Sequence, residues 1–308
     1  KDQDKSIGIH NSLINMLLGA LSSSTADASQ FAKTWQIIQA NFDSLFKTES
    51  SINLLKQTIL KLAVMGKLIA QDPKDEPANE LIIKGLREKS KLIKEGKVKK
   101  EKATKPIDSD QIPFNIPKSW QWARLSEVSF FQEGPGILAK DFRQKGTPLI
   151  RISGMQYSSL SLLGCNFLDK GMVEKKWSHF KLDLDDIVLS SSASLGKVSV
   201  VTKETVGCIV YTGLIRFKRY SSLSKGYLMN FLNSSEFIRQ IDNSKTGASI
   251  KHFGPTHLKG MLIPIPPLSE QKRIITKLDA TFAEIDKKIK IININIKNDK
   301  KLKIEFIS

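Results

Sequence analysis

Cysteine and histidine are scarce in this chain, which has two cysteines and four histidines among 308 residues. Cys165 and Cys208 stand far apart, and neither belongs to a Cys/His cluster with the spacing of metal ligands. A disulfide scaffold and a structural zinc site are therefore not expected. So few cysteines fit a reducing compartment, and we expect the protein in the cytoplasm.

Long apolar runs are also missing. The longest early run, LINMLLGAL from Leu13, is too short to span a bilayer. No small-residue cleavage pattern of a secretory signal follows it closely. We therefore expect neither a signal peptide nor a membrane partner.

Motifs of known catalytic sites are absent as well. The chain has no G-x-x-x-x-G-K-[ST] phosphate loop, no G-x-G-x-x-G opening a helix and no Asn-Pro-Pro-aromatic motif of amino-methylation. Asp169, Glu174 and Lys176 come nearest to nuclease chemistry, but they lie in a lysine-rich loop without convincing strands, whereas a metal-dependent nuclease clusters carboxylates around Mg²⁺. The sequence thus predicts a non-catalytic protein with no cofactor or metal of its own.

Acidic residues are too few to balance the basic ones. The chain has 48 Lys and Arg against 31 Asp and Glu, which leaves a net charge of +17. With 40% hydrophobic residues it is a folded protein whose positive field favours a polyanion. Nucleic acid is the commonest such partner and an anionic membrane surface the next, while a merely soluble basic surface is the plain alternative.

The chain divides into four zones: a helical region over residues 1–70, a basic linker or helix over 71–112, a globular domain over 113–267 and a spacer helix over 268–308. In the second zone, ten Lys and Arg against three Glu between Lys84 and Lys105 indicate a solvated helix face or mobile linker more than a phosphate grip. In the first zone, heptad spacing predicts either a coiled-coil seam or an ordinary amphipathic helix. Its members are Leu45, Ile52, Leu55, Ile59 and Leu62.

The globular zone is rich in short β-type runs separated by Gly, Ser, Asp and Lys turns, which predicts a mostly antiparallel or mixed sheet. One helix, SKGYLMNFLNSSEFIRQID from Ser224, interrupts the series, so the fold class is α+β. The predicted strands are TPLIRIS, DIVLSS, KVSVVT, GCIVYTGLIRFKRY and GMLIPIPP.

The last zone begins with PIPPLSEQKRIITKLD, in which the prolines force an extended exit from the domain. Ser269 is a plausible N-cap, and Glu270 is an acid in the first turn, where the helix dipole favours it. A seam with alternating spacings of 3 and 4 predicts a coiled-coil helix whose partner is another copy, the other half of a longer chain or the 45–62 helix. Its members are Ile275, Leu278, Phe282, Ile285, Ile289, Ile292 and Ile296.

Several stretches together resemble the specificity subunit of type I restriction-modification enzymes. They occur in that family's order from about residue 52 to 290: LLKQTILKLAVMGKLIAQDPKDEPANELI, IPKSWQWARLSEVS, GTPLIRISGMQ, LDLDDIVLSSSASLGKVSVV and SKTGASIKHFGPTHLKGMLIPIPPLSEQKRIITKLD. The resemblance implies a non-catalytic scaffold that binds double-stranded DNA. It further implies that methyltransferase and restriction subunits carry the chemistry, so that S-adenosylmethionine, ATP and Mg²⁺ are expected only on those partners.

The resemblance covers one target recognition domain, whereas a complete subunit of the family has two. The chain therefore resembles either an N-terminal half, cut inside the central conserved helix, or a natural half-subunit that dimerises. Either one is expected to read one half of a split target. It departs from the family at Ala193, where glycine is frequent. An apolar seam left uncovered by the chain predicts that two copies form a homodimer through the C-terminal helix. The alternative from another class is a protein-interaction scaffold that reads no bases of its own.

Candidate DNA contacts come from the chemistry of recognition, because Lys, Arg and Ser grip phosphates while Arg, Lys, Asn, Gln and Ser read base edges. Arg151 is kept apart as a structural residue inside a strand-like run. Four groups of polar residues supply the candidates. They are Lys140, Arg143, Gln144 and Lys145; Ser153, Gln156 and Tyr157; Lys170, Lys175, Lys176 and His179; and Lys197, Lys245, Ser249, Lys251 and His252.

Overall fold

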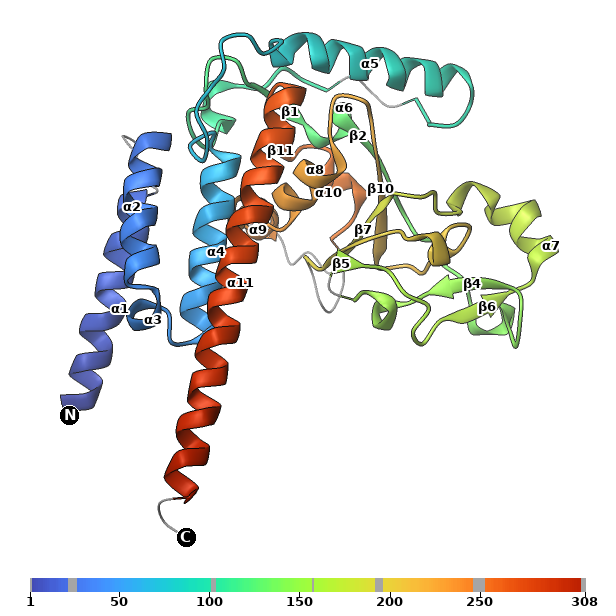
Figure 1. Ribbon diagram of the computed structural model, residues 1–308. Coiled ribbons are helices and arrows are strands. Elements are labelled where there is room, and N and C mark those ends of the chain that lie inside the picture. Colours follow the sequence, from blue (N-terminus) through green and yellow to red (C-terminus); the bar gives the residue numbers. More distant parts are fainter. Residues whose placement is uncertain are drawn as a thin grey trace. The chain divides into compact units, whose positions relative to one another are not determined.

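The computed structural model describes residues 2–21, 27–100, 104–156, 158–191, 196–245 and 253–305. Helices combine with small sheets, which confirms the α+β class (Figure 1). The chain forms two compact units: the helical unit, made of Lys1–Asp72 with Lys272–Ser308, and the sheet unit, Pro73–Gln271. Among the helices described, none is both long and apolar enough to cross a membrane.

The helical unit contains most of a long C-terminal helix and shorter helices from the start of the chain. Helix α4 begins at Glu49 because Thr48 caps it, its Oγ1 accepting a hydrogen bond from the Ser51 amide at 3.1 Å. The helices are α1 (Asp2–Leu21), α2 (Ala28–Ala40), α3 (Phe42–Leu45), α4 (Glu49–Val64) and α11 (Leu268–Glu305).

The expected seam from Leu45 to Leu62 is wrong as a single helix face, because the Thr48 cap separates α3 from α4. Leu45 is buried, but it lies on α3. On α4 the pattern holds from the second turn onward, where Leu55, Ile59 and Leu62 are fully buried. A side-chain cap, which heptad counting ignores, decides the break.

Helix α11 buries Ile274, Leu278, Thr281 and Ile285 within the chain. Polar contacts with its own unit flank this face: Lys56 Nζ lies 2.7 Å from Asp286 Oδ1 on α11, and Lys288 Nζ donates to the Gln39 carbonyl at 3.2 Å. The unit's own helices thus cover part of the expected seam.

The rest of the expected seam has a different environment. Ile275, Phe282 and Ile289 are only half-buried, and Ile291 is 47% exposed. Ile292 and Ile296 lie in the part of α11 whose side chains are outside the described set. The three half-buried residues form a heptad row beside the buried one.

The described residues of the sheet unit form three sheets. Its pairings are antiparallel except β4 with β9 and β5 with β8, so the expectation of a mixed arrangement is confirmed. A two-stranded sheet pairs β1 (Gln121–Arg124) with β11 (Leu262–Ile265). The five-stranded sheet has the order β2 (Ser129–Glu133), β10 (Leu214–Arg219), β7 (Ile187–Ser190), β8 (Val198–Val200) and β5 (Ser158–Ser159), and the four-stranded sheet has the order β3 (Phe142–Arg143), β6 (Asn166–Leu168), β4 (Thr147–Ile150) and β9 (Ile209–Val210).

Helices of the sheet unit correct one prediction. The expected single helix from Ser224 is two helices, α8 (Lys225–Leu232) and α9 (Ser235–Lys245). Ser234 separates them, because its hydroxyl accepts from the Phe237 amide at 3.3 Å and donates to the Phe231 carbonyl at 2.7 Å. The other helices are α5 (Ala78–Lys94), α6 (Leu125–Val128), α7 (Lys170–Met172) and α10 (Pro255–Leu258).

Helix α5 lies in the zone expected to be a linker or solvated helix, and it is packed against the rest of its unit. Leu81 and Ile82 are buried, and a Cβ added to Gly85 would lie 2.6 Å from Ser222 Oγ. The glycine is what lets α5 approach the segment after β10 so closely.

The first turn of α11 is fastened inside the sheet unit. Glu270 is completely buried and accepts from Trp120 Nε1 at 2.9 Å. Gln271, also completely buried, donates through Nε2 to the Ser222 and Pro266 carbonyls, each at 3.0 Å, and accepts from the Ser224 amide at 2.8 Å. Ser269 stands inside this turn instead of capping it, because the helix begins at Leu268, directly after the two prolines.

Candidate nucleic-acid interface

The segment from Lys140 through β3 to the β3–β4 turn presents the first group of candidate residues. Lys140, Arg143, Gln144 and Lys145 are all exposed. Arg143 is held in place because Nη1 donates to the Lys140 carbonyl at 3.0 Å and to the Phe142 carbonyl at 2.9 Å. This segment therefore displays two lysines and an anchored arginine.

A second group lies on consecutive helical turns, where the sequence suggested a loop. Asp169 begins them by accepting from the Met172 amide at 2.8 Å, and α7 continues through residues 173–180. Val173 is buried against the core beneath the four-stranded sheet, with Trp177 and Phe180 packed beside it. Lys170, Lys175, Lys176 and His179 remain exposed.

These two groups meet at one end of the four-stranded sheet. Strand β6 pairs with both β3 and β4, with Phe142 and Thr147 both opposite Leu168. Gly146, with φ of 143°, lies so close that an added Cβ would be 2.0 Å from the Leu168 carbonyl oxygen. The turn bearing Lys145 thus lies beside the start of α7.

We call the surface formed by these two groups, without His179, the basic edge. It carries one arginine and five lysines, and its acidic neighbours are partly occupied, because Glu174 pairs with Lys181 and Asp169 caps α7. Its members are Lys140, Arg143, Gln144, Lys145, Lys170, Lys175 and Lys176.

A smaller polar group lies beyond the opposite end of β4. Gln156 lies beside β8, which begins one residue after Lys197, and β5 runs parallel to β8 with Ser158 opposite Ser199. The Ser199 hydroxyl donates to the Gln156 carbonyl at 2.8 Å, and Gln156 Nε2 donates to the Ser153 carbonyl at 2.8 Å. Ser153, Gln156 and Lys197 are exposed, so two of the sequence groups are brought together here as well.

Arg151 lies just after β4, exposed, whereas the sequence placed it inside a strand. Its Nη1 donates to Asn166 Oδ1 at 3.0 Å, and its guanidinium stacks 5.3 Å from the centre of the Tyr211 ring. These contacts agree with the structural role expected of it.

Several candidates fall outside the described residues. They include Tyr157, Ser249, Lys251 and His252, together with residues 192–195 and their Ala193. Lys245 ends α9, but its side chain is not among those described.

The sequence of this chain is similar to that of a known protein family. Residues 117–298 match the family model described as "Type I restriction modification DNA specificity domain". That range includes every candidate contact residue and the expected seam up to Ile296. The chain belongs to this family.

Two curated relatives in Escherichia coli match nearly the whole chain. The specificity subunit of the type I restriction enzyme EcoAI is 35% identical over 287 residues, covering 92% of this chain and 48% of the relative. The EcoEI specificity subunit is 32% identical over 291 residues, covering 91% and 48%. The chain thus spans about half the length of these relatives.

A solved structure of the HsdS subunit from Thermoanaerobacter tengcongensis is also similar. Its sequence is 16% identical, the alignment covers 92% of this chain and 52% of that one, and the TM-score is 0.47.

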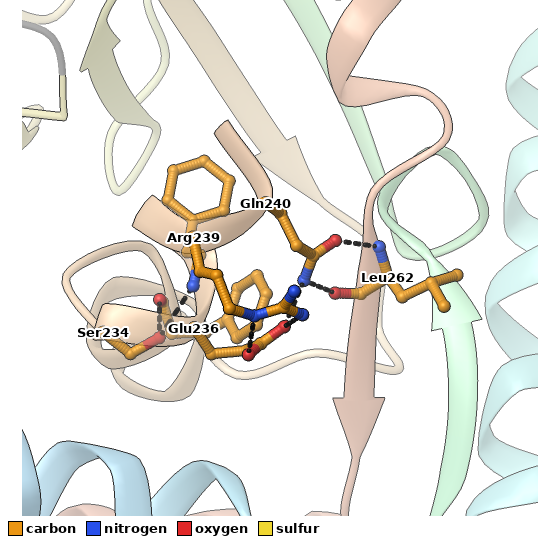
Figure 2. Close-up of polar contacts among 7 residues, drawn as sticks. Ser234, Glu236, Arg239, Gln240 and Leu262 are labelled. Atoms are coloured by element: carbon orange, nitrogen blue, oxygen red, sulfur yellow. Dashed lines mark hydrogen bonds and ion pairs between the residues drawn. The ribbon is translucent and has the colours of Figure 1, made fainter. Parts of the chain in front are cut away.

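In this specificity domain, α9 is anchored by a side-chain network that the sequence did not indicate (Figure 2). The Gln240 amide pairs with one residue of β11, donating to the Leu262 carbonyl and accepting from its amide, both at 2.8 Å. Glu236 receives a bidentate hydrogen bond from Arg239, at 2.9 and 2.7 Å. Gln240 thereby acts like one residue of a further strand and satisfies the edge of β11.

A charged network beneath the five-stranded sheet also escaped the sequence analysis. Arg216 Nε lies 3.1 Å from Asp186 Oδ2, and both side chains are buried. Burial raises the pKa of Asp186, while Arg216 opposes that rise. Among the described residues, no three His, Cys, Asp or Glu side chains are grouped as metal ligands. The alternation of residues along β7 and β10 does not predict the Arg216–Asp186 pair, because the two residues come from separate segments of the chain.

Proposed function

We propose that this chain is a sequence-specific DNA-recognition domain that reads one half of a split target. It acts without catalysis of its own. Its relatives are named as specificity subunits of type I restriction enzymes, and the matched family model is that of a DNA specificity domain.

The observation that carries this proposal is the basic edge. Two groups of cations from separate segments lie side by side at one end of a sheet, each held by a buried apolar anchor or a backbone hydrogen bond. Such a rigid surface suits phosphates of fixed spacing. The group of Ser153, Gln156 and Lys197 supplies side chains of the types that read base edges.

Selection from a random pool of duplexes tests the proposal. The chain is mixed with a methyltransferase subunit of its own restriction system, and bound DNA is sequenced after washing at moderate salt. Enrichment of a short defined half-site is expected. Equal retention of all sequences, with binding that falls away steeply as salt rises, would instead indicate electrostatic attraction alone and favour a protein-interaction scaffold.

We further propose that methyltransferase and restriction subunits assemble on this chain, so that S-adenosylmethionine, ATP and Mg²⁺ are used by those partners. Such an assembly works on cytoplasmic DNA, which agrees with the scarcity of cysteine. Co-purification of tagged chain with the methyltransferase subunit, and S-adenosylmethionine binding only in the complex, are the expected results.

A homodimer through α11 is the proposed assembly of this half-length chain. The half-buried row of Ile275, Phe282 and Ile289, with exposed Ile291 nearby, supports it. Antiparallel pairing of two such helices would bring two recognition domains to the two halves of a split site.

A further inference from the structure

Arg151 keeps the contacts expected of a structural residue, but it differs from the buried arginines of the sheet unit. Arg124 donates from Nε, Nη1 and Nη2 to three backbone carbonyls and to Gln111 Oε1. Arg216 pairs with the Asp186 carboxylate, and both side chains are buried. Arg151 instead is exposed, and it has no carboxylate partner among the residues that the structure describes.

The guanidinium of Arg151 leaves most of its donors unused. Only Nη1 is engaged, through the hydrogen bond to Asn166 Oδ1. The Nε and Nη2 groups form one edge of the planar guanidinium, and they have no acceptor in the described part of the chain. Because the side chain is exposed, this edge is open to a ligand from outside.

The position of this open edge is fixed by two supports from the four-stranded sheet. Asn166 lies on β6, which pairs with β4. The Tyr211 ring, whose centre is 5.3 Å from the guanidinium carbon of Arg151, is itself anchored. Its hydroxyl donates to the Ile137 carbonyl at 3.2 Å, and its backbone amide donates to the Ile150 carbonyl at 2.9 Å. An arginine held in this way loses little side-chain freedom when it binds a ligand.

The neighbours of Arg151 are polar. The residue directly follows β4, at the end of that strand opposite the β3–β4 turn and its lysines. The Gly154 amide donates to the Arg151 carbonyl at 2.9 Å, which closes a turn that carries exposed Ser153. Gln156, also exposed, donates through Nε2 to the Ser153 carbonyl at 2.8 Å. Arg151 therefore lies beside uncharged side chains of the types that read base edges, whereas the lysines of the basic edge suit phosphates.

We propose that Arg151 reads a guanine in the major groove of the DNA target, with its open Nε–Nη2 edge donating to O6 and N7 of that base. Guanine is the base that presents two acceptors side by side in the major groove, and an arginine fork matches them. The inference rests on the proposed function, because it assigns a role within the proposed DNA interface. Tyr211 and Asn166 are positioning residues, which hold the guanidinium without touching the base.

Replacement of single guanines by 7-deazaguanine tests the contact, because this base keeps O6 and Watson–Crick pairing but lacks the N7 acceptor. Selection from the random pool, with the full chain and its methyltransferase subunit, first defines the half-site. Each guanine of either strand is then replaced in turn, and the affinity is measured by fluorescence anisotropy. One replacement should weaken binding by about tenfold, since it removes a hydrogen bond to a charged donor.

Arg151→Met identifies the residue that makes this contact, because methionine keeps the apolar stem and removes every donor. The variant should bind the unmodified half-site about tenfold more weakly. At the guanine that the wild type senses, 7-deazaguanine should then weaken its binding less than about twofold further, because the contact is already lost. Arg87→Met, at an exposed position on α5, is the matched control and should respond to each replacement as the wild type does.

Variants of Tyr211 test the positioning role. Tyr211→Phe keeps the ring and should retain the preference for guanine at that position within about twofold. Tyr211→Leu removes the ring, and the preference should fall at least about threefold while binding to a duplex without the half-site is unchanged. Asn166→Ala removes the other support and is the second variant if Tyr211→Leu melts early.

Two patterns would overturn the inference for Arg151. A loss in Arg151→Met that is equal on all duplexes would make it a phosphate contact, and unchanged binding would leave it purely structural. The wild-type selection judges the proposed function separately. If no half-site is enriched, both the proposed function and this inference fall. If a half-site is enriched but lacks guanine, or if 7-deazaguanine weakens the wild type and Arg151→Met alike, only the inference falls.

Discussion

Gln271 shows how one buried polar side chain can fix the direction of a helix. It bonds three backbone groups from two segments, the Ser222 and Pro266 carbonyls and the Ser224 amide. Together with Glu270 on Trp120, it locks the first turn of α11 to its unit immediately after the two prolines have set the chain direction. The direction of α11, which the sequence assigned to the prolines alone, therefore also depends on Glu270 and Gln271.

Replacing Gln271 by leucine should lower the free energy of unfolding by about 3 kcal/mol, because three buried backbone groups lose their partner at roughly 1 kcal/mol or more each. Urea denaturation followed by tryptophan fluorescence measures this change. Ser269→Ala in the same turn is exposed and serves as the control, with an expected change within about 0.5 kcal/mol. Equal midpoints for Gln271→Leu and the control would contradict this role for Gln271.

Cys208 is a buried thiol whose raised pKa predicts low reactivity. Burial raises its pKa to about 11, and burial also raises the pKa of the more accessible Cys165. At pH 8 both thiols are mostly neutral, and Cys208 is only 2% exposed. Iodoacetamide should therefore modify Cys165 first in the folded protein and both residues equally after denaturation.

The pKa of Cys208 also has a consequence for stability. Between the ordinary thiol pKa of about 8.5 and the folded value of about 11, the folded state keeps a proton that the unfolded state loses. The unfolding free energy should thus fall as pH rises through that range, and less so in Cys208→Ala. Mass spectrometry of the labelled peptides shows which cysteine iodoacetamide modifies first. Modification of Cys208 as fast as Cys165 in the folded protein would show that the core around Cys208 opens.

At the scale of elements, a glycine and a helix cap determine where the β3–β4 turn and α7 lie. The β3–β4 turn can cross β6 only because Gly146 lacks a side chain, and Asp169 then starts α7 alongside it. Two local features thus place Lys145 near Lys170, although 25 residues separate them in sequence (170 − 145). This closeness turns two ordinary lysine groups into one surface.

Neutralising Lys145 and Lys170 together should reduce the salt dependence of DNA binding. If each contacts one phosphate, the slope of log affinity against log salt should become shallower by about 1.8, because each contact contributes about 0.9. Lys84→Ala with Lys203→Ala removes the same charge at exposed positions away from the edge. Fluorescence anisotropy at several salt concentrations measures these slopes. Equal slopes for the Lys145/Lys170 variant and the Lys84/Lys203 control would show that the basic edge is not part of the DNA interface.

At the scale of the whole molecule, the decisive question is what covers α11. The chain buries Ile274, Leu278 and Ile285 with its own helices, so part of the apolar stripe is satisfied internally. Ile275, Phe282 and Ile289 keep partial exposure, and each gains about 1 kcal/mol if a partner completes its burial. A dimer must therefore use this second row, and Ile285 is unsuitable for testing it because a charge there would disrupt the unit.

If the proposed dimer forms, Phe282→Glu with Ile289→Glu should convert it to monomers in sedimentation at about 10–100 µM, while both units stay folded. Lys56, which lies 5.8 Å from the Phe282 ring, can accept the first new carboxylate as a partner. Ala280→Glu with Ala283→Glu adds the same charge on the exposed face and should leave the dimer intact. A native chain that sediments as a monomer throughout would refute the dimer and leave DNA recognition unaffected.

The sequence by itself determined the class of fold, the positions of most strands and the family. Alternating apolar residues and turn signals are local, so β4, β7, β8, β9, β10 and β11 all fall within the predicted runs. The order of quoted motifs then indicated the specificity family, which the match over residues 117–298 confirms.

Only the tertiary structure decided which candidate residues share a surface. The basic edge depends on the pairings of β6, and the place of Gln156 beside β8 depends on a hydrogen bond from Ser199. The buried row of α11 depends on which neighbouring helices reach it. Caps at Thr48 and Ser234 likewise broke helices that periodicity predicted as continuous. Periodicity predicts which residues share a face of one helix or strand. The shared surfaces depend instead on contacts between residues far apart in the chain, and a local sequence pattern does not contain the free energy of those contacts.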